Sequence, residues 1–250
     1  MKNTAIVTSS LLAFLISSAA LIAIPSASAQ VLVSDDFEAG PVGSDISGKR
    51  SAKGGALWSA NYSSAILKFQ GNVVPTNADL GELNARFWVN PKGRAVATLS
   101  TDLAAINSYQ FDIGWLWFNG AGSLGVNARA VLPNDTCCYW FTRGMFEGRA
   151  QVQVSWRDAA GTLIPIGFLP VKPTLYNKGL GCTGLSIRVT GSTQQLYVND
   201  EPFDAERRPV QAAPADKVRT RVQLTAEASP AASVDIRFDN IAVTQTPASR

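Results

Sequence analysis

The chain has 250 residues, of which 46% are hydrophobic, and its 22 Lys and Arg against 19 Asp and Glu give a formal net charge of +3. The charges nearly balance and form no basic blocks, so the sequence indicates neither a nucleic-acid partner nor an anionic membrane surface. Histidine is absent, which excludes Ser-His-Asp hydrolases, Cys-His proteases, His-ligated zinc sites and lyases with a histidine base.

Residues 1–29 have the pattern of a secretory signal peptide. Lys2 is the only charge in residues 1–34, an apolar run covers residues 11–24, and Pro25 and Ala27-Ser28-Ala29 follow it. A membrane anchor is the alternative, but the run is shorter than the roughly 20 residues that a spanning helix needs. We expect cleavage after Ala29 and a secreted protein, extracellular or periplasmic, without membrane insertion.

The rest of the chain alternates apolar and polar residues with a period of two, which is typical of β-strands with one buried face. Predicted strands begin at residue 31 and then cover residues 65–69, 73–74, 84–89, 95–99, 108–117, 124–132, 139–141, 150–156, 163–171, 185–199, 218–226 and 234–243. Gly, Pro, Asn and Asp mark the turns between them. No helical period is sustained after the signal peptide, so we expect an all-β sandwich.

Residues 185–199 give the clearest local prediction. Leu185, Ile187 and Val189 alternate with polar residues, Gly191-Ser192 offers a tight turn, and the alternation resumes after it. This pattern predicts a β-hairpin with one apolar face. Two strands bury too little apolar surface to be stable alone, so the apolar face should pack against a second sheet.

The three cysteines are Cys137, Cys138 and Cys182. Neighbouring residues rarely bridge each other without strain, so one of the adjacent pair is expected to bond Cys182. We write the bridge as Cys138–Cys182, with Cys137 as the alternative partner. Closing a loop of about 45 residues would contribute about 4 kcal/mol in the chain-entropy account.

Residues 108–117 form the most aromatic segment. In a regular strand, Trp115 and Trp117 share one face with Phe111 and Ile113. That face is either part of the core or a platform on which a sugar ring stacks.

A second aromatic pair, Tyr139-Trp140, follows the adjacent cysteines and precedes an arginine. The two rings point to opposite sides of a strand, so at least one of them is expected to be exposed. The candidate ligand-binding residues are therefore Trp115, Trp117, Tyr139, Trp140 and Arg143.

Three segments together resemble the concanavalin A-like lectin/glucanase family, in its laminin-G-like and secreted bacterial forms. Asp35-Asp36-Phe37-Glu38, with Gly43 and Trp58, is similar to the first strand and loop of those domains. Residues 186–203 are similar to their penultimate hairpin, with Asp200 where glycine is usual, and residues 238–243 are similar to their closing strand.

The resemblance implies a two-sheet antiparallel jelly-roll sandwich over residues 30–244, with the first and last strands paired and a frayed tail over residues 245–250. It also implies a use in binding or cleaving glycans. A structural calcium is expected where the two strands meet, with Glu38 and Asp239 as its carboxylate ligands. The alternative is that Glu38 pairs with Arg237 or Lys68.

The catalytic carboxylates of the glucanase branch lie together on one strand face. This chain has no such cluster, since Asp112 and Glu147 each stand apart from other acids, and we therefore assign no catalytic residue. Lyase chemistry with Tyr139 or Tyr197 as the base, near Arg143 or Arg129, remains open.

Our first hypothesis is a secreted module that binds a carbohydrate or cell-surface polymer. The alternatives are a polysaccharide lyase or atypical glycosidase on the same fold, or an exported structural or interaction domain without a small-molecule site.

Overall fold

The structure is a computed structural model that describes residues 29–71, 82–101, 103, 106–130, 136–173, 179–210 and 221–246. Residues 1–28 of the predicted signal peptide, the predicted strand at 73–74 and residues 247–250 of the predicted tail lie outside this part. In the described part there is no helix that could cross a membrane.

The described residues contain fifteen β-strands and no helix, which confirms the all-β prediction. The strands are β1 (Gln30–Asp35), β2 (Leu57–Gly71), β3 (Leu83–Ser100), β4 (Ser108–Gly120), β5 (Gly122–Ala130), β6 (Cys138–Phe146), β7 (Arg149–Arg157), β8 (Leu163–Phe168), β9 (Lys172–Pro173), β10 (Leu180–Thr190), β11 (Thr193–Val198), β12 (Glu201–Pro202), β13 (Arg208–Pro209), β14 (Arg221–Ala228) and β15 (Val234–Gln245).

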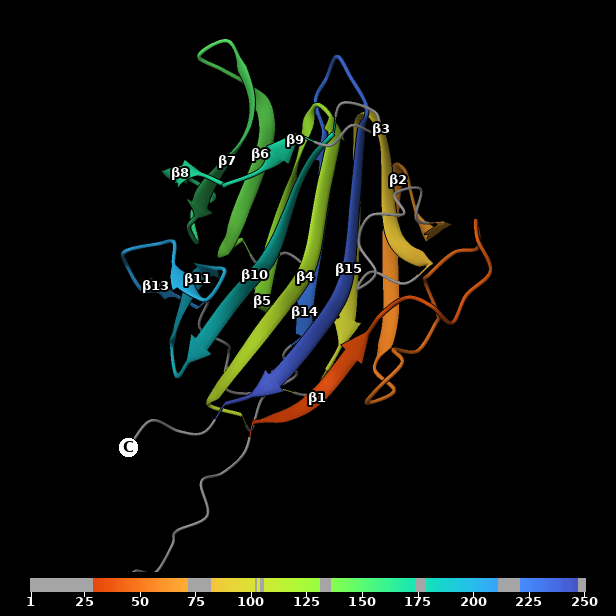
Figure 1. Ribbon diagram of the computed structural model, residues 1–250, viewed down its shortest axis with the longest axis vertical. Helices are drawn as coiled ribbons and strands as arrows, with labels where there is room; N and C mark the ends of the chain where they lie inside the picture. Colours follow the sequence, from red (N-terminus) through yellow and green to blue (C-terminus); the bar gives the residue numbers. More distant parts are fainter. Residues whose placement is uncertain are drawn as a thin grey trace, which may run out of the picture.

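All strands belong to one continuous antiparallel sheet with the order β12-β11-β10-β4-β15-β3-β14-β5-β6-β7-β8, to which β1, β2, β9 and β13 add at the sides. The sheet curls so that its two halves face each other, with β4, β10 and β15 in front of β5 and β14 (Figure 1). We call β12, β11, β10, β4, β15 and the first half of β3 the front layer. The back layer is the second half of β3 with β14, β5, β6, β7 and β8. The expected two layers are thus halves of one sheet.

The strands β2 and β3 carry the sheet from one layer to the other. β3 pairs with β15 over residues 85–89 and with β14 over residues 94–99. Between these parts Lys92 has a φ of 63°, and a Cβ at Gly93 would lie within 2.8 Å of three backbone carbonyl oxygens. Only glycine allows the backbones to approach this closely at the bend.

The core lies between the two layers. Phe111 of β4 and Leu185 of β10 line the same small gap as Val126 of β5 and Phe141 of β6. The Tyr109 hydroxyl crosses from β4 and donates a hydrogen bond of 2.9 Å to the carbonyl of Ala128 in β5. Burial of apolar side chains from both layers is the main stabilising contribution to such a fold.

The two ends of the described chain meet in this core. β1 pairs with β15, and the Phe37 ring lies edge-on against Phe238 with 5.5 Å between the ring centroids. Buried Asp35 accepts hydrogen bonds from Trp58 Nε1 at 2.7 Å and from the Phe37 amide at 3.0 Å. Burial raises the pKa of Asp35, and these two donors oppose that rise. The expected pairing of first and last strands is confirmed.

The hairpin predicted over residues 185–199 is β10 and β11, paired from Leu185↔Val198 to Thr190↔Thr193. Its apolar residues are buried, which confirms that this face packs on the other layer. The next turn contains Asn199 and Asp200, with φ of 51° and 65°. Two positive φ values are typical of a type I′ turn, and Asn and Asp adopt them more readily than most residues. This explains how Asp200, which is not glycine, fits this turn.

Replacing Trp58 with Phe should lower the free energy of unfolding by about 2 kcal/mol, because Asp35 then keeps a buried carboxylate oxygen without its donor. Urea unfolding measures this difference. Trp88→Phe is the matched control: the Trp88 indole donates to the exposed Asn90 side chain, and its loss should cost less than about 0.5 kcal/mol. Equal destabilisation by the two changes would contradict the role of Asp35.

Candidate functional site

Three residues on adjacent strands of the front layer interrupt the regular β-pairing side by side. Gly184 of β10 and Asn240 of β15 have positive φ values of 66° and 52°, and Gly114 of β4 lies between them. The regular pairings on both sides of β4 skip these three residues, since Trp115 and Ile113 are each paired but Gly114 is not. A Cβ at Gly114 would lie 2.8 Å from the Asn240 Cβ. The alternation of faces therefore shifts by one residue here.

This shift corrects the predicted face of the two tryptophans. Before Gly114, Phe111 and Ile113 face the core, and after it Leu116 and Phe118 do. Trp115 and Trp117 consequently lie on the outer face of the front layer and do not share a face with Phe111.

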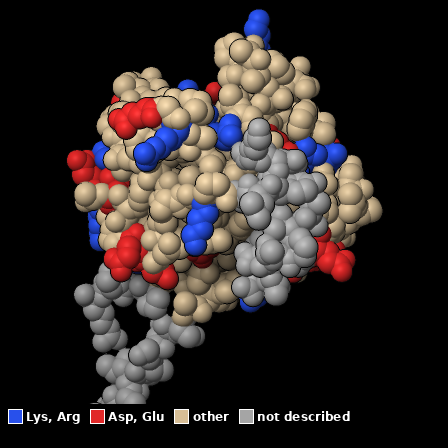
Figure 2. Space-filling model, turned by 45° about the horizontal axis from the view of Figure 1, so that its top comes forward, with Lys and Arg blue, Asp and Glu red and all other residues tan. Residues whose placement is uncertain are grey.

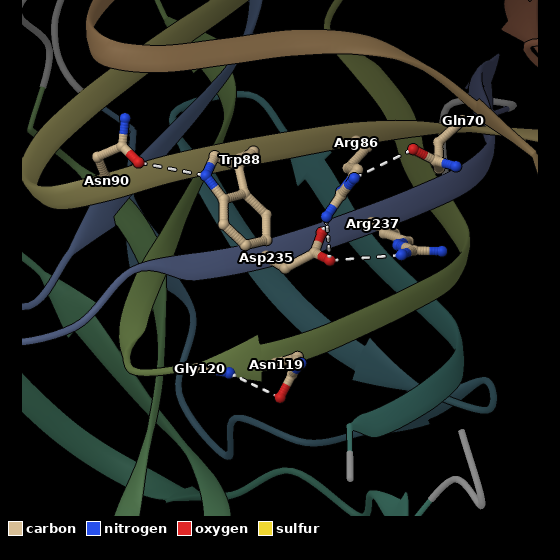
Figure 3. Close-up of polar contacts among 8 residues, drawn as sticks. All are labelled: Gln70, Arg86, Trp88, Asn90, Asn119, Gly120, Asp235 and Arg237. Atoms are coloured by element: carbon tan, nitrogen blue, oxygen red, sulfur yellow. Dashed lines mark hydrogen bonds and ion pairs between the residues drawn. The ribbon is translucent and has the colours of Figure 1, made fainter. Parts of the chain in front are cut away.

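The outer face of the front layer carries a polar network. Figure 3 shows Asp235 between Arg86 and Arg237. Arg86 binds both Asp235 carboxylate oxygens at 2.8 Å, and Arg237 donates to one of them at 3.3 Å. The guanidinium groups also lie over rings, Arg86 at 4.8 Å from the centroid of Trp88 and Arg237 at 4.9 Å from that of Trp117.

The Trp117 side chain is thus no open platform for a ligand. Trp117 is only 4% exposed, and a Cβ at Gly179 would lie 2.1 Å from its ring. Trp115 is half-buried on the same face. Both arginines contact the one Asp235 carboxylate and each also stacks on a ring, so this face is held together by its own contacts.

Tyr139 is a buried link between the layers. Its hydroxyl accepts a hydrogen bond from the Leu196 amide at 3.1 Å and donates one to Asp204 at 3.3 Å. Burial, together with the nearby Asp204 charge, raises the pKa of Tyr139. A completely buried phenol with a raised pKa cannot serve as the base of a lyase.

The other lyase residues are also engaged elsewhere. Arg143 donates to the carbonyl of Gly120, and burial lowers its pKa. Arg129 donates to the carbonyl of Gly191. Tyr197 lies under Arg188, with 3.9 Å between the guanidinium carbon and the ring centroid. The proposed tyrosine–arginine pairs are not formed.

Trp140 lies on the outer face of the back layer, away from Trp117. Its ring covers Gly125 so closely that a Cβ there would lie 2.3 Å from the ring. The Arg157 guanidinium lies over the ring at 4.9 Å from its centroid. Trp140 is 5% exposed, so the expectation of an exposed ring is wrong for Trp140 and for the fully buried Tyr139.

A hollow of about 240 Å³ opens beside Trp140. We call it the Trp140 hollow; it is formed by neighbouring strands β3, β14, β5, β6 and β7, and its lining includes Arg94, Asn127, Trp140, Arg157, Gln223 and Thr225. Amide, hydroxyl and guanidinium groups dominate this lining, and no Asp or Glu is among its described residues. The hollow offers hydrogen-bonding groups but no carboxylate pair for acid–base catalysis.

Asn127 is the most informative residue in the hollow. Its Oδ1 accepts a hydrogen bond of 3.0 Å from the Arg129 amide, at an irregularity in the pairing of β5 with β14. Its Nδ2 is buried and has no hydrogen-bond partner, and the residue is 3% exposed. Buried polar groups are nearly always hydrogen-bonded. An unpaired buried donor in a polar hollow therefore indicates a place for a ligand oxygen.

Sequence reasoning selected Trp140 but missed Asn127, Arg157, Gln223 and Thr225. Each of these occupies the polar position of an alternating strand, as most surface residues do. No local signal shows that they converge.

The predicted Cys138–Cys182 bridge is not formed, and all three cysteines are free. Cys138 faces the Trp140 hollow on the outer side of the back layer, whereas Cys182 is opposite Leu116 and faces the core from β10. Burial raises the pKa of Cys138 to about 12 and that of Cys182 to about 11. Both thiols are therefore protonated and unreactive near neutral pH.

The two predicted calcium ligands lie near the junction of β1 and β15. Glu38 Oε1 accepts a hydrogen bond from the Leu83 amide at 2.9 Å, and Asp239 Oδ1 accepts one from the Asn240 amide at 2.8 Å. No group of three or more metal-ligating side chains occurs among the described residues. Calcium takes six to eight oxygen ligands, of which these two would supply only a part. A calcium ion here stays a prediction.

Charges of both signs are interspersed on the face turned forward in Figure 2, so this face presents no broad field of one sign.

Replacing Tyr139 with Phe should lower the free energy of unfolding by about 2 kcal/mol, because the buried Leu196 amide loses its acceptor. Chemical denaturation measures the change. In the control Tyr197→Phe, the lost hydroxyl contacts only half-buried Gln195, and the cost should stay within about 0.5 kcal/mol. A Tyr139→Phe protein of unchanged stability would show that this hydroxyl is not a structural link.

No family model matches the chain, and neither does any curated protein. The fold is similar to that of the carbohydrate esterase vb_24B_21 from the Shiga toxin-encoding bacteriophage phi24B, with a TM-score of 0.50 and 14% identity over 88% of this chain and 100% of that one. The Emp47p carbohydrate recognition domain gives a TM-score of 0.40 and 9% identity over 81% and 93% of the two chains. The binding domain of botulinum neurotoxin DC in complex with SialylT gives a TM-score of 0.42 and 10% identity over 88% of this chain and 49% of that one. This chain thus spans about half of that domain's length. At these identities the comparisons concern the fold, and membership of the concanavalin A-like family stays a prediction.

Proposed function

We propose that this protein is a carbohydrate-binding module that holds a sugar residue in the Trp140 hollow. The observation that carries the proposal is the Asn127 amide in the lining of the hollow, whose buried Nδ2 donor has no partner. Leaving such a donor unpaired costs about 1–3 kcal/mol. A hydroxyl or ring oxygen of a sugar would recover that free energy on binding.

The size and chemistry of the hollow support a single sugar residue. Its volume of about 240 Å³ is smaller than the roughly 300–1,000 Å³ typical of sites for drug-sized ligands. Gln223 and Thr225 lie next to each other on β14, with 3.4 Å between Nε2 and Oγ1. They add amide and hydroxyl groups beside Asn127, and the edge of Trp140 adds an apolar wall.

Binding without turnover is the form of the function that the site supports best. The structure of similar fold is named as a carbohydrate esterase, which supports carbohydrate as the ligand class. A serine esterase that uses a histidine base is excluded here because the chain has no histidine. The described lining of the hollow contains no carboxylate that could act in glycoside hydrolysis.

We also propose that the protein acts after export, on a polysaccharide outside the cytoplasm. The support for this is the signal-peptide pattern of residues 1–29.

The change Asn127→Asp tests the site. Asp keeps an oxygen that can accept from the Arg129 amide but removes the free donor, so affinity for the bound polysaccharide should fall at least about tenfold, which corresponds to about 1.4 kcal/mol. Affinity electrophoresis against a panel of soluble neutral and acidic polysaccharides identifies the bound polymer and measures the loss.

Asn119→Asp is the matched control. The Asn119 Oδ1 also accepts from a backbone amide, that of Gly120, but this residue lies on the front layer (Figure 3). The control should bind like the wild type. Equal affinity of the Asn127→Asp protein, with its melting temperature unchanged, would remove the Trp140 hollow as the binding site.

A further inference from the structure

We infer that the sugar bound in the Trp140 hollow is acidic, a uronic acid residue whose carboxylate pairs with Arg157. This inference rests on the proposed function, because it names the class of ligand for the same site.

The first observation is that Arg157 has no carboxylate partner in the described part of the chain. No ion pair of the described residues includes it. The acid next to it in sequence, Asp158, accepts a hydrogen bond from the Thr162 amide at 2.8 Å and belongs to the turn. Among the described residues, the Arg157 guanidinium is therefore a cation without an acidic partner at the wall of a polar hollow.

The other arginines that stack on aromatic rings are different. Arg86 and Arg237 share the Asp235 carboxylate, and Arg188 pairs with Asp200 at 3.0 Å. Each of these stacked cations thus has an acid of the protein itself. Arg157 has the same kind of ring contact as the others, but no acid of the described residues pairs with it.

The net charge of the hollow depends on which cations of its lining have acidic partners. Arg94, the other cation of the lining, binds Glu227 at 3.1 Å, which leaves Arg157 as the cation of the described lining without a counter-charge. A neutral sugar would leave this charge unmatched, whereas a uronate would neutralise it. Electrostatic complementarity of this kind sets specificity in partly buried sites.

The geometry favours a carboxylate in particular. Because the guanidinium lies over the Trp140 ring, its planar edge of N–H donors is held in a fixed orientation. Such an edge binds a planar carboxylate through two parallel hydrogen bonds. Asn127 lines the same hollow and has an unpaired Nδ2, which would then bind a hydroxyl or ring oxygen of the same sugar.

The test uses acidic polysaccharides and their carboxyl-reduced forms, which keep the linkages and lose the charge. Polygalacturonate, alginate and hyaluronan are suitable probes in isothermal titration calorimetry with the full secreted chain. The wild type should bind at least one acidic polymer ten times more tightly than its reduced form, and added salt should weaken the binding. Arg157→Gln should remove this preference.

Arg188→Gln is the matched control, since Arg188 also stacks on a ring but lies on the front layer. It should keep the wild-type preference, and both variants should melt within a few degrees of the wild type. Circular dichroism checks that they are folded.

The outcomes separate the inference from the proposed function. Equal binding of acidic and reduced polymers, or an unchanged preference in Arg157→Gln, overturns the inference and leaves a carbohydrate-binding module. If dextran sulfate binds as tightly as the acidic polysaccharide, the site does not distinguish a carboxylate from a sulfate, and the inferred specificity for a carboxylate is wrong. If no polysaccharide binds, acidic or neutral, the proposed function itself is wrong.

Discussion

The bend of β2 and β3 is the constraint on which the rest of the molecule depends. At Gly93 the two backbones approach so closely that no Cβ fits among three carbonyl oxygens, and β3 changes its partner from β15 to β14 there. One continuous sheet thereby becomes two facing layers. The apolar sides of both layers are buried against each other, and their polar sides become two separate outer surfaces.

Both surfaces carry arginines stacked on tryptophans, but these arginines have different partners on the two layers. On the front layer, Asp235 pairs with both arginines that cover Trp88 and Trp117, and Figure 3 shows this shared carboxylate. On the back layer, Arg157 covers Trp140 but the described residues give it no acid. In the front network each arginine has an ion-pair contact with Asp235, which the two share. The Trp140 hollow on the back layer retains hydrogen-bonding groups and Arg157, a cation without an ion-pair partner among the described residues, and these are properties of a binding site.

Buried contacts between distant parts of the chain support this site but do not line it. Asp35, Trp58 and Phe37 join the start of the domain to Phe238 of the last strand, while Tyr139 joins β6 to β11. Such buried contacts hold the back-layer strands in register. A shallow hollow made by side chains of five strands depends on that register, because a slip of one residue would turn each side chain to the other face.

The sequence by itself determined most of the long strands and the β10–β11 hairpin with its buried face, because alternation and turn residues are local signals. The pairing of the first and last strands was implied by the resemblance of residues 35–38 and 238–243 to a known family, and not by alternation. Only the tertiary structure decided the face of Trp115 and Trp117, since the shift at Gly114 arises together with Gly184 and Asn240 on neighbouring strands. The same holds for the Trp140 hollow. Asn127 and Gln223 come from β5 and β14, which are neighbours in the sheet but distant in the chain, and Arg157 comes from β7, two strands beyond β5. Their polar character is local information, whereas their convergence comes from hydrogen bonding between strands, which alternation does not encode.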